Sequence, residues 1–490
     1  MRYKFLSVCA ALAAVTACSD FAGVNDNPNG PTDVPPPSIL PSVIQNLVGT
    51  VNGVTSLNIR GGGLWSQYYS EIQYRDEDKF IVRSGTSGGW GLFNSVVEDA
   101  QRMIVKGEES NAANWRAVGR VMKSYAYSVM TDAMGDLPYT DALKGDTLLH
   151  PTYDTQQTIY DSLFANLTTA SSEIDLSGGA VGFSGTSDLV YHGNMAFWGK
   201  LSNSLRLRLA IHLSNVDPTK AASEAAAAVA GGLISADSES AKLTYLSSSP
   251  NRNPIYNDAR SRDDYGMSKT FVDSLTSWAD PRLPVFAQIN KDTIVANRTY
   301  QGLPNGLNDG EGPALFYISR IGARWRETAA ARMDLLSYSE VLFLEAEAAE
   351  RGWITGNAAQ LYQNAITASM AMYGVSPAAT TTYLAQPKVA YDAAGATQAG
   401  HLQQIAYQKW VSMFMQGMEA WTEVRRTRVP LLTPGPRAVF GAGVPGVIPE
   451  RLPYDDNELV LNANNVIAAV AAQGFAASND IQHPLWFTGR

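Results

Sequence analysis

The stretch SYSEVLFLEAEAAERGWITGNAAQLYQNAITASMAMYG, residues 337–374, predicts two helices joined by a short turn. Apolar side chains recur with the 3.6-residue period of a helix over residues 338–351 and again over 358–373. Ser337 and Glu340 form a capping box before the first helix, and a glycine follows the last periodic residue of each helix. Two helices of this length with a short connection are typical of a tetratricopeptide-like hairpin.

The same helical period dominates the rest of the chain, whereas strand patterns are few and short. We therefore expect an all-α protein, in which tetratricopeptide-like hairpins form a scaffold with long elaborated loops and a few short strands. Loops this long are usually functional in a compact protein. The predicted helices outside the hairpin cover residues 94–106, 114–130, 155–174, 195–213, 220–230 and 402–426, the strands 241–246, 295–300 and 315–318, and the long loops 231–267, 287–334 and 427–458.

The N-terminus has the pattern of an export signal that ends in a lipid attachment site. Arg2 and Lys4 precede an apolar run, residues 5–17, that is too short to span a bilayer, and small residues precede Cys18. The pattern resembles a bacterial lipobox, so we expect residues 1–17 to be a signal peptide and Cys18 to carry lipid. The alternative is an ordinary secretory signal that is cut after residue 17. Residues 18–41 are rich in proline and predict a flexible tether, followed by a single domain over residues 42–490.

Composition excludes several classes of protein. The chain has 490 residues and a formal net charge of −9, and it has no basic stripe that would serve a nucleic-acid binder. Its two cysteines are Cys9, inside the predicted signal, and Cys18, so the mature chain has no thiol for a disulfide, a zinc site or nucleophilic catalysis. After the signal no apolar run is long enough for a transmembrane helix. The lipid is therefore the only membrane attachment that we expect.

Five segments together resemble one known family. They are NPNGPTD (27–33), AMGDLPY (133–139), WGKLSNSLRLRLA (198–210), the helix of residues 337–352, and the segment 408–426 that contains QGMEAWTEVRR. In this order they resemble the SusD/RagB family of nutrient-binding outer-membrane lipoproteins, and the resemblance covers nearly the whole mature chain. It implies a helical, lipid-anchored protein at the cell surface that binds oligosaccharides or, in some members, peptides. It also implies a partner, a SusC-type TonB-dependent transporter, over which the lipoprotein closes as a lid.

A glycan site needs flat aromatic rings against the apolar face of a sugar and polar groups for its hydroxyls. Several aromatic and arginine side chains follow the tether or lie near the long loops, and the resemblance favours an early aromatic loop for ligand contacts. The spacing of the first three also fits a buried helix face, and Trp90 could instead be a staple before a helix. The candidate ligand-binding residues are Trp65, Tyr68, Tyr69, Tyr74, Arg75, Arg83, Trp90, Trp278 and Trp325.

Residues inside periodic helices have a structural interpretation instead. Trp115, Trp198, Trp410 and Trp421 are expected in the core. Arg206 and Arg208 lie on an otherwise apolar helix, so we expect them to pair with buried acids.

Enzyme and adaptor functions remain alternatives. Residues 85–89, GTSGG, match a nucleophile elbow, but the sheet that such an elbow requires is missing from the pattern. A lipid-anchored glycan hydrolase would need two facing carboxylates, for which Asp263, Asp264, Asp309 and Glu311 can be nominated. A helical-repeat adaptor that binds only proteins is the third possibility. The histidines lack metal-ligand spacing, so we expect no metal site. Overall we expect a binding protein with no catalytic residue and no cofactor.

Overall fold

A computed structural model describes residues 33–83, 89–177, 182–441 and 444–490. The predicted signal peptide, Cys18 and the tether up to residue 32 lie outside these ranges. The longer helices are α2 (Pro36–Val51), α3 (Glu98–Glu109), α4 (Ala113–Met134), α5 (Gln156–Glu173), α6 (Met195–His212), α7 (Pro218–Ala230), α12 (Tyr338–Glu350), α13 (Ala358–Met372), α15 (Gln398–Ser412), α16 (Gly417–Thr427) and α18 (Ala463–Ala472). The shorter ones are α8 (Pro254–Ser261), α9 (Lys269–Ser277), α10 (Leu283–Phe286), α11 (Ala323–Arg326), α14 (Pro377–Leu384) and α17 (Glu458–Leu461).

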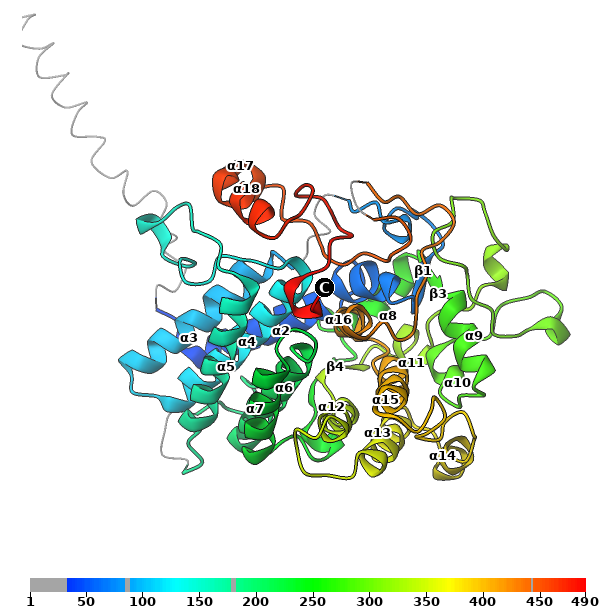
Figure 1. Ribbon diagram of the computed structural model, residues 1–490, viewed down its shortest axis with the longest axis horizontal. Helices are drawn as coiled ribbons and strands as arrows, with labels where there is room; N and C mark the ends of the chain where they lie inside the picture. The colour runs from blue at the N-terminus through cyan, green and yellow to red at the C-terminus, as the bar shows by residue number, and fades with distance from the viewer. Residues whose placement is uncertain (1–32, 84–88, 178–181, 442–443) are drawn as a thin grey trace, which may run out of the picture.

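The helices pack as successive pairs that run across the molecule. Helix α3 packs on α4, α4 on α5, α5 on α6 and α6 on α7, and α12 then joins this row to α13 and α15. Figure 1 shows the row from α3 at the left to α14 at the lower right, with α17 and α18 above it. The mainly helical architecture that the sequence predicts is confirmed. Among the described helices, none has the length and apolar character that crossing a bilayer requires.

The quoted stretch forms the hairpin of α12 and α13, as predicted. The Ser337 hydroxyl accepts a hydrogen bond from the Glu340 backbone N–H at 3.2 Å and so caps α12. Gly352 and Gly374 follow the two helices with φ of +73° and +78°, which an L side chain rarely adopts. Local capping and periodicity thus account for this element.

The described strands form two small antiparallel sheets, and only one of their four strands was predicted. β1 (Tyr69–Glu71) pairs with β3 (Tyr265–Met267), and β2 (Ala241–Thr244) pairs with β4 (Arg332–Leu336). The strand predicted over 241–246 is therefore confirmed over residues 241–244. The strands predicted at 295–300 and 315–318 are wrong, because these segments contain the single 3₁₀ turns Val295–Asn297 and Leu315–Tyr317. Short apolar runs do not separate a turn from a strand.

The single helix predicted over residues 402–426 is interrupted between α15 and α16. Met415 has a φ of +74°, which ends the helical path. Gly417 then begins α16 against the π-helical segment η1 (Leu57–Gly63), and a Cβ on Gly417 would lie 2.0 Å from the Asn58 carbonyl oxygen. Only glycine permits this approach. The interruption therefore depends on a segment more than three hundred residues away, which helical periodicity does not reveal.

The folded body begins earlier than the predicted domain boundary at residue 42. Helix α2 starts at Pro36, and Ile39 and Leu40 are buried. Proline is favoured in the first turn of a helix, because its missing N–H has no intrahelical partner there. The prolines of residues 36–41 were interpreted as part of a flexible tether, although they belong to the first turns of α2. The predicted tether is therefore wrong over residues 36–41.

Candidate functional site

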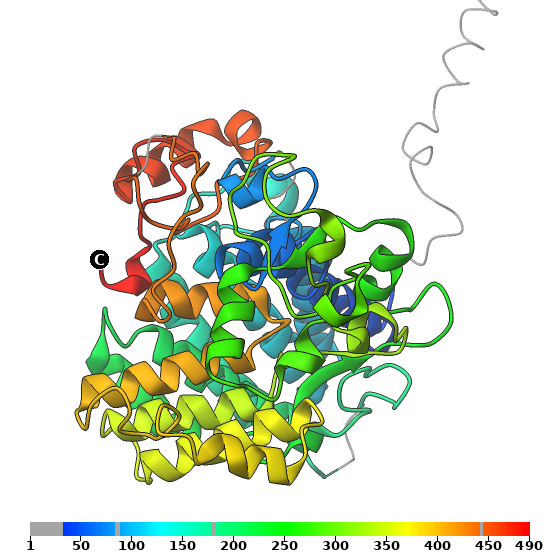
Figure 2. The same ribbon diagram turned by 90° about the vertical axis from the view of Figure 1, so that its right-hand side faces the viewer.

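A cavity of about 370 Å³ opens among loops outside the helical scaffold. It is formed by segments that are far apart in the sequence: one follows β1, and the others lie between α16 and the C-terminus. Figures 1 and 2 show the C-terminal segment, orange to red, beside the early blue segment at the top of the molecule. The lining residues are Phe80, Ile81, Val82, Arg83, Val439, Phe440, Gly441, Pro453, Tyr454, Asp456, Asn479, Ile481 and Gln482.

One wall of the cavity is aromatic and aliphatic. The rings of Phe80 and Phe440 meet edge to face, with centroids 6.1 Å apart. The backbone N–H of Val439 donates to the Lys79 carbonyl at 2.8 Å, and this bond holds the two loops together. Ile81 and Val439 are 39% and 48% exposed. The wall therefore offers apolar surface to a ligand.

The opposite wall is a C-terminal segment that is tied to the scaffold. The Leu452 N–H donates to the Ala133 carbonyl at 2.6 Å, and the Tyr454 hydroxyl donates to the Asp136 carbonyl at 2.9 Å. Arg451 is buried behind this wall, where its guanidinium lies 4.1 Å from the ring centre of Phe475. These contacts fix the wall before any ligand is present.

The polar groups of the cavity are suited to a neutral ligand. Arg83 is the cation in its wall, but its Nε donates to both carboxylate oxygens of Glu77 at 2.7 and 2.9 Å, and its Nη2 lies 3.3 Å from Glu71. Its charge is therefore already compensated. Asn479 and Gln482 contribute amides, which can meet sugar hydroxyls as donors or acceptors.

Below Arg83, Glu71 is buried beside two other carboxylates. Burial comes first among the causes, followed by the charges of Glu77 and Asp78, and together they raise the pKa of Glu71 to about 10. Glu71 therefore holds a proton in the folded protein at neutral pH. The unfolded chain releases that proton near the ordinary pKa of a glutamate.

This difference predicts a pH effect on stability. A raised carboxyl pKa contributes stability that is complete below the unfolded pKa and is lost as pH rises toward the folded pKa, at up to about 1.4 kcal/mol per pH unit. We expect Glu71→Gln, which keeps the shape without the proton, to flatten the fall of the unfolding free energy between pH 6 and 9. Urea unfolding at several pH values measures it, with the exposed Glu109→Gln as control. Parallel curves for the Glu71 variant and the unmodified protein would contradict the assignment.

Three of the predicted ligand residues are core residues. Trp65, Tyr68 and Tyr69 are at most 1% exposed. The Trp65 ring lies 5.0 Å from that of Trp421, and Tyr68 stacks on Trp410 at 5.5 Å. Their spacing therefore reflects a buried face, which was the alternative interpretation. The prediction that these three rings contact ligand is wrong for this structure, because the core encloses them.

The other predicted residues are dispersed. Arg83 lines the cavity. Trp325 is buried at 3%, and Arg75, equally buried, donates to the backbone carbonyls of Asn308 and Glu311. Tyr74 is 56% exposed beneath the guanidinium of Arg262.

The two remaining tryptophans are partly buried against aromatic neighbours. Trp90 packs on Phe93 with centroids 4.8 Å apart, and Trp278 stacks on Tyr407 at 4.2 Å. Neither lines the cavity. Ligand contact by Tyr74, Trp90 and Trp278 stays a prediction.

The acids nominated for hydrolysis are held by arginines. Asp263 pairs with Arg320 at 2.7 Å and Arg326 at 3.1 Å, and Asp264 pairs with Arg262 at 2.5 Å. Asp309 and Glu311 likewise pair with Arg75 and Arg437. Residues 85–88 of the possible nucleophile elbow lie outside the described residues. Each of the four nominated acids is thus paired with at least one arginine, whereas glycoside hydrolysis needs two carboxyl groups that face the substrate.

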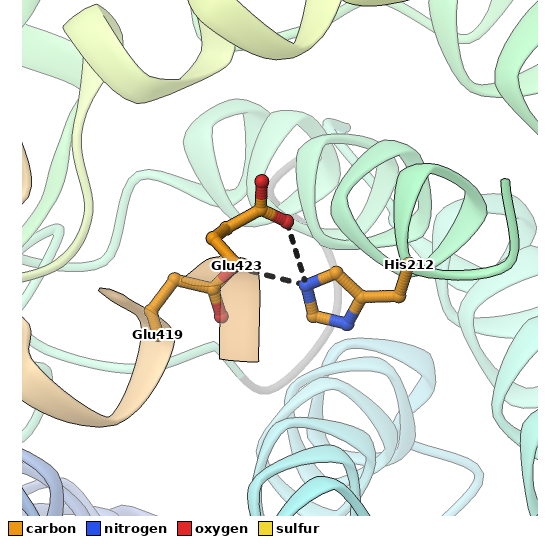
Figure 3. Close-up of side chains that lie close together, drawn as sticks. All are labelled: His212, Glu419 and Glu423. Atoms are coloured by element: carbon orange, nitrogen blue, oxygen red, sulfur yellow. Dashed lines mark hydrogen bonds and ion pairs between the residues drawn. The ribbon is translucent and has the colours of Figure 1, made fainter. Parts of the chain in front are cut away.

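A buried histidine lies close to two glutamates, in an arrangement that could suggest a metal site (Figure 3). His212 Nε2 lies 2.9 Å from Glu419 and 3.8 Å from Glu423, and its Nδ1 lies 3.0 Å from Asp132. Burial opposes a charge on the ring, but Glu419 and Asp132 outweigh it and raise the pKa of His212 to about 9. In this structure the four side chains therefore form a buried ionic network.

The network extends through the motifs that carry the family resemblance. Arg208 Nε donates to Glu340 at 2.7 Å, which joins α6 to α12. Arg426 makes a two-pronged contact with Glu347, with both N–O distances 2.7 Å, and so joins α16 to α12. The predicted pairing of Arg208 with a buried acid is confirmed, and Arg206 pairs with Glu224 at the edge of the scaffold. The motif residues therefore hold helices together and do not line the cavity.

Most cavity residues were not singled out from the sequence. The prediction that loop 427–458 is functional was the available signal for Phe440 and Tyr454. Asn479 and Gln482 lie near the C-terminus in a stretch without a recognisable motif. The four predicted core tryptophans, Trp115, Trp198, Trp410 and Trp421, are confirmed as buried.

One protein family matches most of the chain. A SusD-like family model with the description "Starch-binding associating with outer membrane" matches residues 28–455. No curated protein matches the chain.

Solved structures match over nearly the whole chain. A chitin-binding protein is 27% identical with a TM-score of 0.80, and the match covers 93% of this chain and 100% of that one. A chitin-binding SusD homolog from Flavobacterium johnsoniae is 25% identical with a TM-score of 0.81, covering 92% and 98%. A SusD homolog from Bacteroides fragilis is 25% identical with a TM-score of 0.78, covering 94% and 100%.

Proposed function

Because the chain belongs to the SusD-like family of starch-binding proteins that associate with the outer membrane, we propose that it is a cell-surface lipoprotein that captures oligosaccharides for uptake. The family is one of carbohydrate-binding proteins, so the prediction of a binding protein and not an enzyme is confirmed. The ligand site is the cavity beside Arg83. Its cargo passes to a SusC-type TonB-dependent transporter, over which the protein closes as a lid.

The composition of the cavity carries the proposal for the site. Phe80 and Phe440 supply apolar ring surface, and Asn479 and Gln482 supply amides. This is the pairing that a sugar ring requires, since it has an apolar face and a rim of hydroxyls. An extended peptide would use the same groups and is the second ligand class to test.

Loss of an aromatic wall should weaken binding. We expect Phe440→Ala to lower oligosaccharide affinity about tenfold, because removing a ring contact costs about 1–1.5 kcal/mol. Isothermal titration calorimetry with trisaccharides and with tripeptides measures the effect and separates the two ligand classes. Phe316→Ala, which removes a phenylalanine 43% exposed outside the cavity, is the matched control.

An unchanged affinity in the Phe440 variant, with oligosaccharide still bound, would move the site elsewhere. No heat with either ligand class would favour the adaptor alternative. Product release from polysaccharide by the purified protein would favour the hydrolase alternative.

The predicted lipid anchor should hold the protein at a membrane, and variants of the two cysteines test this location. In a host with lipoprotein processing, we expect the unmodified protein in the membrane fraction and Cys18→Ser in the soluble exported fraction. Cys9→Ser is the control, because Cys9 lies inside the predicted signal and its variant should remain membrane-bound. A Cys18 variant that stays with the membrane would contradict acylation at this residue.

The transporter is the part of the proposal that rests on the resemblance alone. We expect the protein, tagged and extracted from its native host in mild detergent, to copurify with a large TonB-dependent barrel. Recovery of the protein without such a barrel would oppose the role as a lid while leaving the binding function in place.

A further inference from the structure

Five exposed apolar side chains gather on two neighbouring loops that do not line the ligand cavity. Ile289, Ile294, Val295, Leu315 and Phe316 are between 42% and 69% exposed. We call this group the apolar loop tip. Single exposed apolar residues are common on proteins, but several that lie together mark a surface that contacts something other than water.

Hydrogen bonds join the two loops and fix the apolar loop tip. The Lys291 backbone N–H donates to the Phe316 carbonyl at 2.8 Å, and Asn290 Nδ2 donates to the Tyr317 carbonyl at 3.1 Å. The Asn290 N–H also donates to the Thr299 carbonyl at 2.9 Å, which closes the first loop at its base. A single 3₁₀ turn, Val295–Asn297, then forms the end of that loop. The exposed side chains are therefore held in place before any partner is present.

Two cations flank the most exposed residues of the apolar loop tip. Lys291 and Arg298 lie on either side of Ile294 and Val295 in the sequence. Neither pairs with a carboxylate among the described residues, and Arg298 Nε donates to the Asp292 backbone carbonyl at 3.0 Å. Asp292 is only 5% exposed, and its carboxylate accepts the Ile294 N–H at 2.9 Å. The exposed charges within residues 289–298 are therefore both positive, on a chain whose net charge is −9.

The charge beside an exposed apolar surface indicates what can cover it. Val460 and Leu461 on α17 are also strongly exposed, but Asp455 and Asp456 precede them in the chain. Apolar side chains flanked by cations instead match a lipid surface, where acyl chains lie beneath anionic headgroups. The family associates with the outer membrane, so a lipid surface is close to the protein.

We propose that the apolar loop tip docks on a lipid surface that carries anionic headgroups. Ile294 and Val295 enter the apolar boundary of the bilayer, and Lys291 and Arg298 meet headgroup phosphates. This contact is additional to the lipid predicted on Cys18. A second attachment restricts how the body is oriented over the membrane, which an anchor at one point does not. The inference does not depend on the ligand cavity.

Vesicle binding by the unacylated protein tests the role of the cations. The mature chain, residues 18–490, with Cys18→Ser has neither lipid nor thiol. We expect it to cosediment with phosphatidylcholine vesicles that contain phosphatidylglycerol, less so at high salt, and only weakly with phosphatidylcholine alone. Lys291→Gln combined with Arg298→Gln should weaken binding to the anionic vesicles at least about tenfold, because each cation near an anionic surface contributes about fivefold.

A pair of serine substitutions tests the apolar part of the contact. We expect Ile294→Ser combined with Val295→Ser to weaken vesicle binding about tenfold, because less apolar surface enters the bilayer. Val460→Ser combined with Leu461→Ser is the matched control, since these residues are at least as exposed but lie beside acids, and its binding should not change. Both serine pairs replace exposed side chains, so their unfolding midpoints and oligosaccharide affinities should equal those of the unmodified protein.

A fluorescent label locates the contact directly. In the thiol-free chain, Val295→Cys provides one site for an environment-sensitive dye, and Val460→Cys provides the control site. We expect anionic vesicles to shift the emission of the dye at residue 295 to shorter wavelength and to leave the dye at residue 460 unchanged.

The other outcomes contradict the proposal in distinct ways. No binding to anionic vesicles, or equal binding by the Ile294→Ser, Val295→Ser variant and the unmodified protein, overturns the lipid contact. Equal binding to neutral vesicles overturns the role of Lys291 and Arg298. An emission shift at residue 460 alone overturns the placement of the contact on the apolar loop tip. A dimer that the two serines dissociate, without vesicle binding, replaces the lipid surface with a second copy of the chain.

Discussion

Arg426→Met is expected to lower the free energy of unfolding by about 3–5 kcal/mol, since it removes the buried cation that Glu347 and Glu423 share. Arg351 remains beside Glu347, and Lys409 remains beside Glu423. The Arg426 side chain is 4% exposed. It contacts both oxygens of Glu347 at 2.7 Å and one oxygen of Glu423 at 2.7 Å, and it donates to the Ser214 hydroxyl at 2.8 Å. Methionine retains the aliphatic stem, so the loss reports the charge and its hydrogen bonds. Urea unfolding at pH 7 provides the measurement.

Two further variants make that result specific. Arg102→Met removes an exposed arginine whose pairs lie on the surface of α3, and its effect should stay below about 1 kcal/mol. Adding Glu347→Gln to Arg426→Met removes the charge of one carboxylate that lost its contact with Arg426. The double variant should therefore recover part of the lost unfolding free energy. If Arg426→Met lowered the free energy of unfolding no more than Arg102→Met does, the ionic network would not be a principal stabiliser of the contact between α12 and α16.

Trp65→Ala should destabilise the protein by about 3–5 kcal/mol, the usual range for truncating a buried aromatic side chain. Trp65 is 1% exposed, and its indole N–H donates to the Glu77 carbonyl at 3.1 Å. Trp65→Phe, which keeps a ring but loses this donor, should fall between the alanine variant and the unmodified protein. Thermal and urea unfolding measure the effect, with the partly buried Trp353→Ala as a milder control.

The same variants decide between a core role and a ligand role for Trp65. We expect Trp65→Phe, assayed while folded, to keep the oligosaccharide affinity of the unmodified protein, in contrast to Phe440→Ala. If Trp65→Phe left stability unchanged and weakened binding, Trp65 would be a ligand-binding residue and its assignment to the core would be wrong.

Local signals explain the parts of the fold that the sequence predicted well. The Ser337 cap, the period of residues 338–351 and the glycine after it specify α12 without reference to the rest of the chain. The confirmed family resemblance also implied a largely helical protein. The interruption between α15 and α16 depends instead on close backbone packing of Gly417 against Asn58, and the start of α2 depends on what buries Ile39 and Leu40.

The candidate site was less predictable because residue type does not report burial. Trp65 and Tyr68 have the chemistry of sugar-binding residues, yet the scaffold surrounds them. Arg83 was identified from its early loop. Phe440 and Gln482 line the same cavity as Arg83 only because loops near the C-terminus return to the top of the molecule, and no local pattern in the sequence indicates that return.

The cavity is built from loop tips, while the ionic network and the aromatic core belong to the helices beneath them. The hydrogen bond from Val439 to Lys79 joins the two loops of one wall, and the bond from Leu452 to Ala133 attaches the other wall to α4. The cavity and the folded core are therefore encoded by largely separate sets of positions. Transplanting these tips between relatives with the same framework offers a route to altered cavities on an unchanged scaffold.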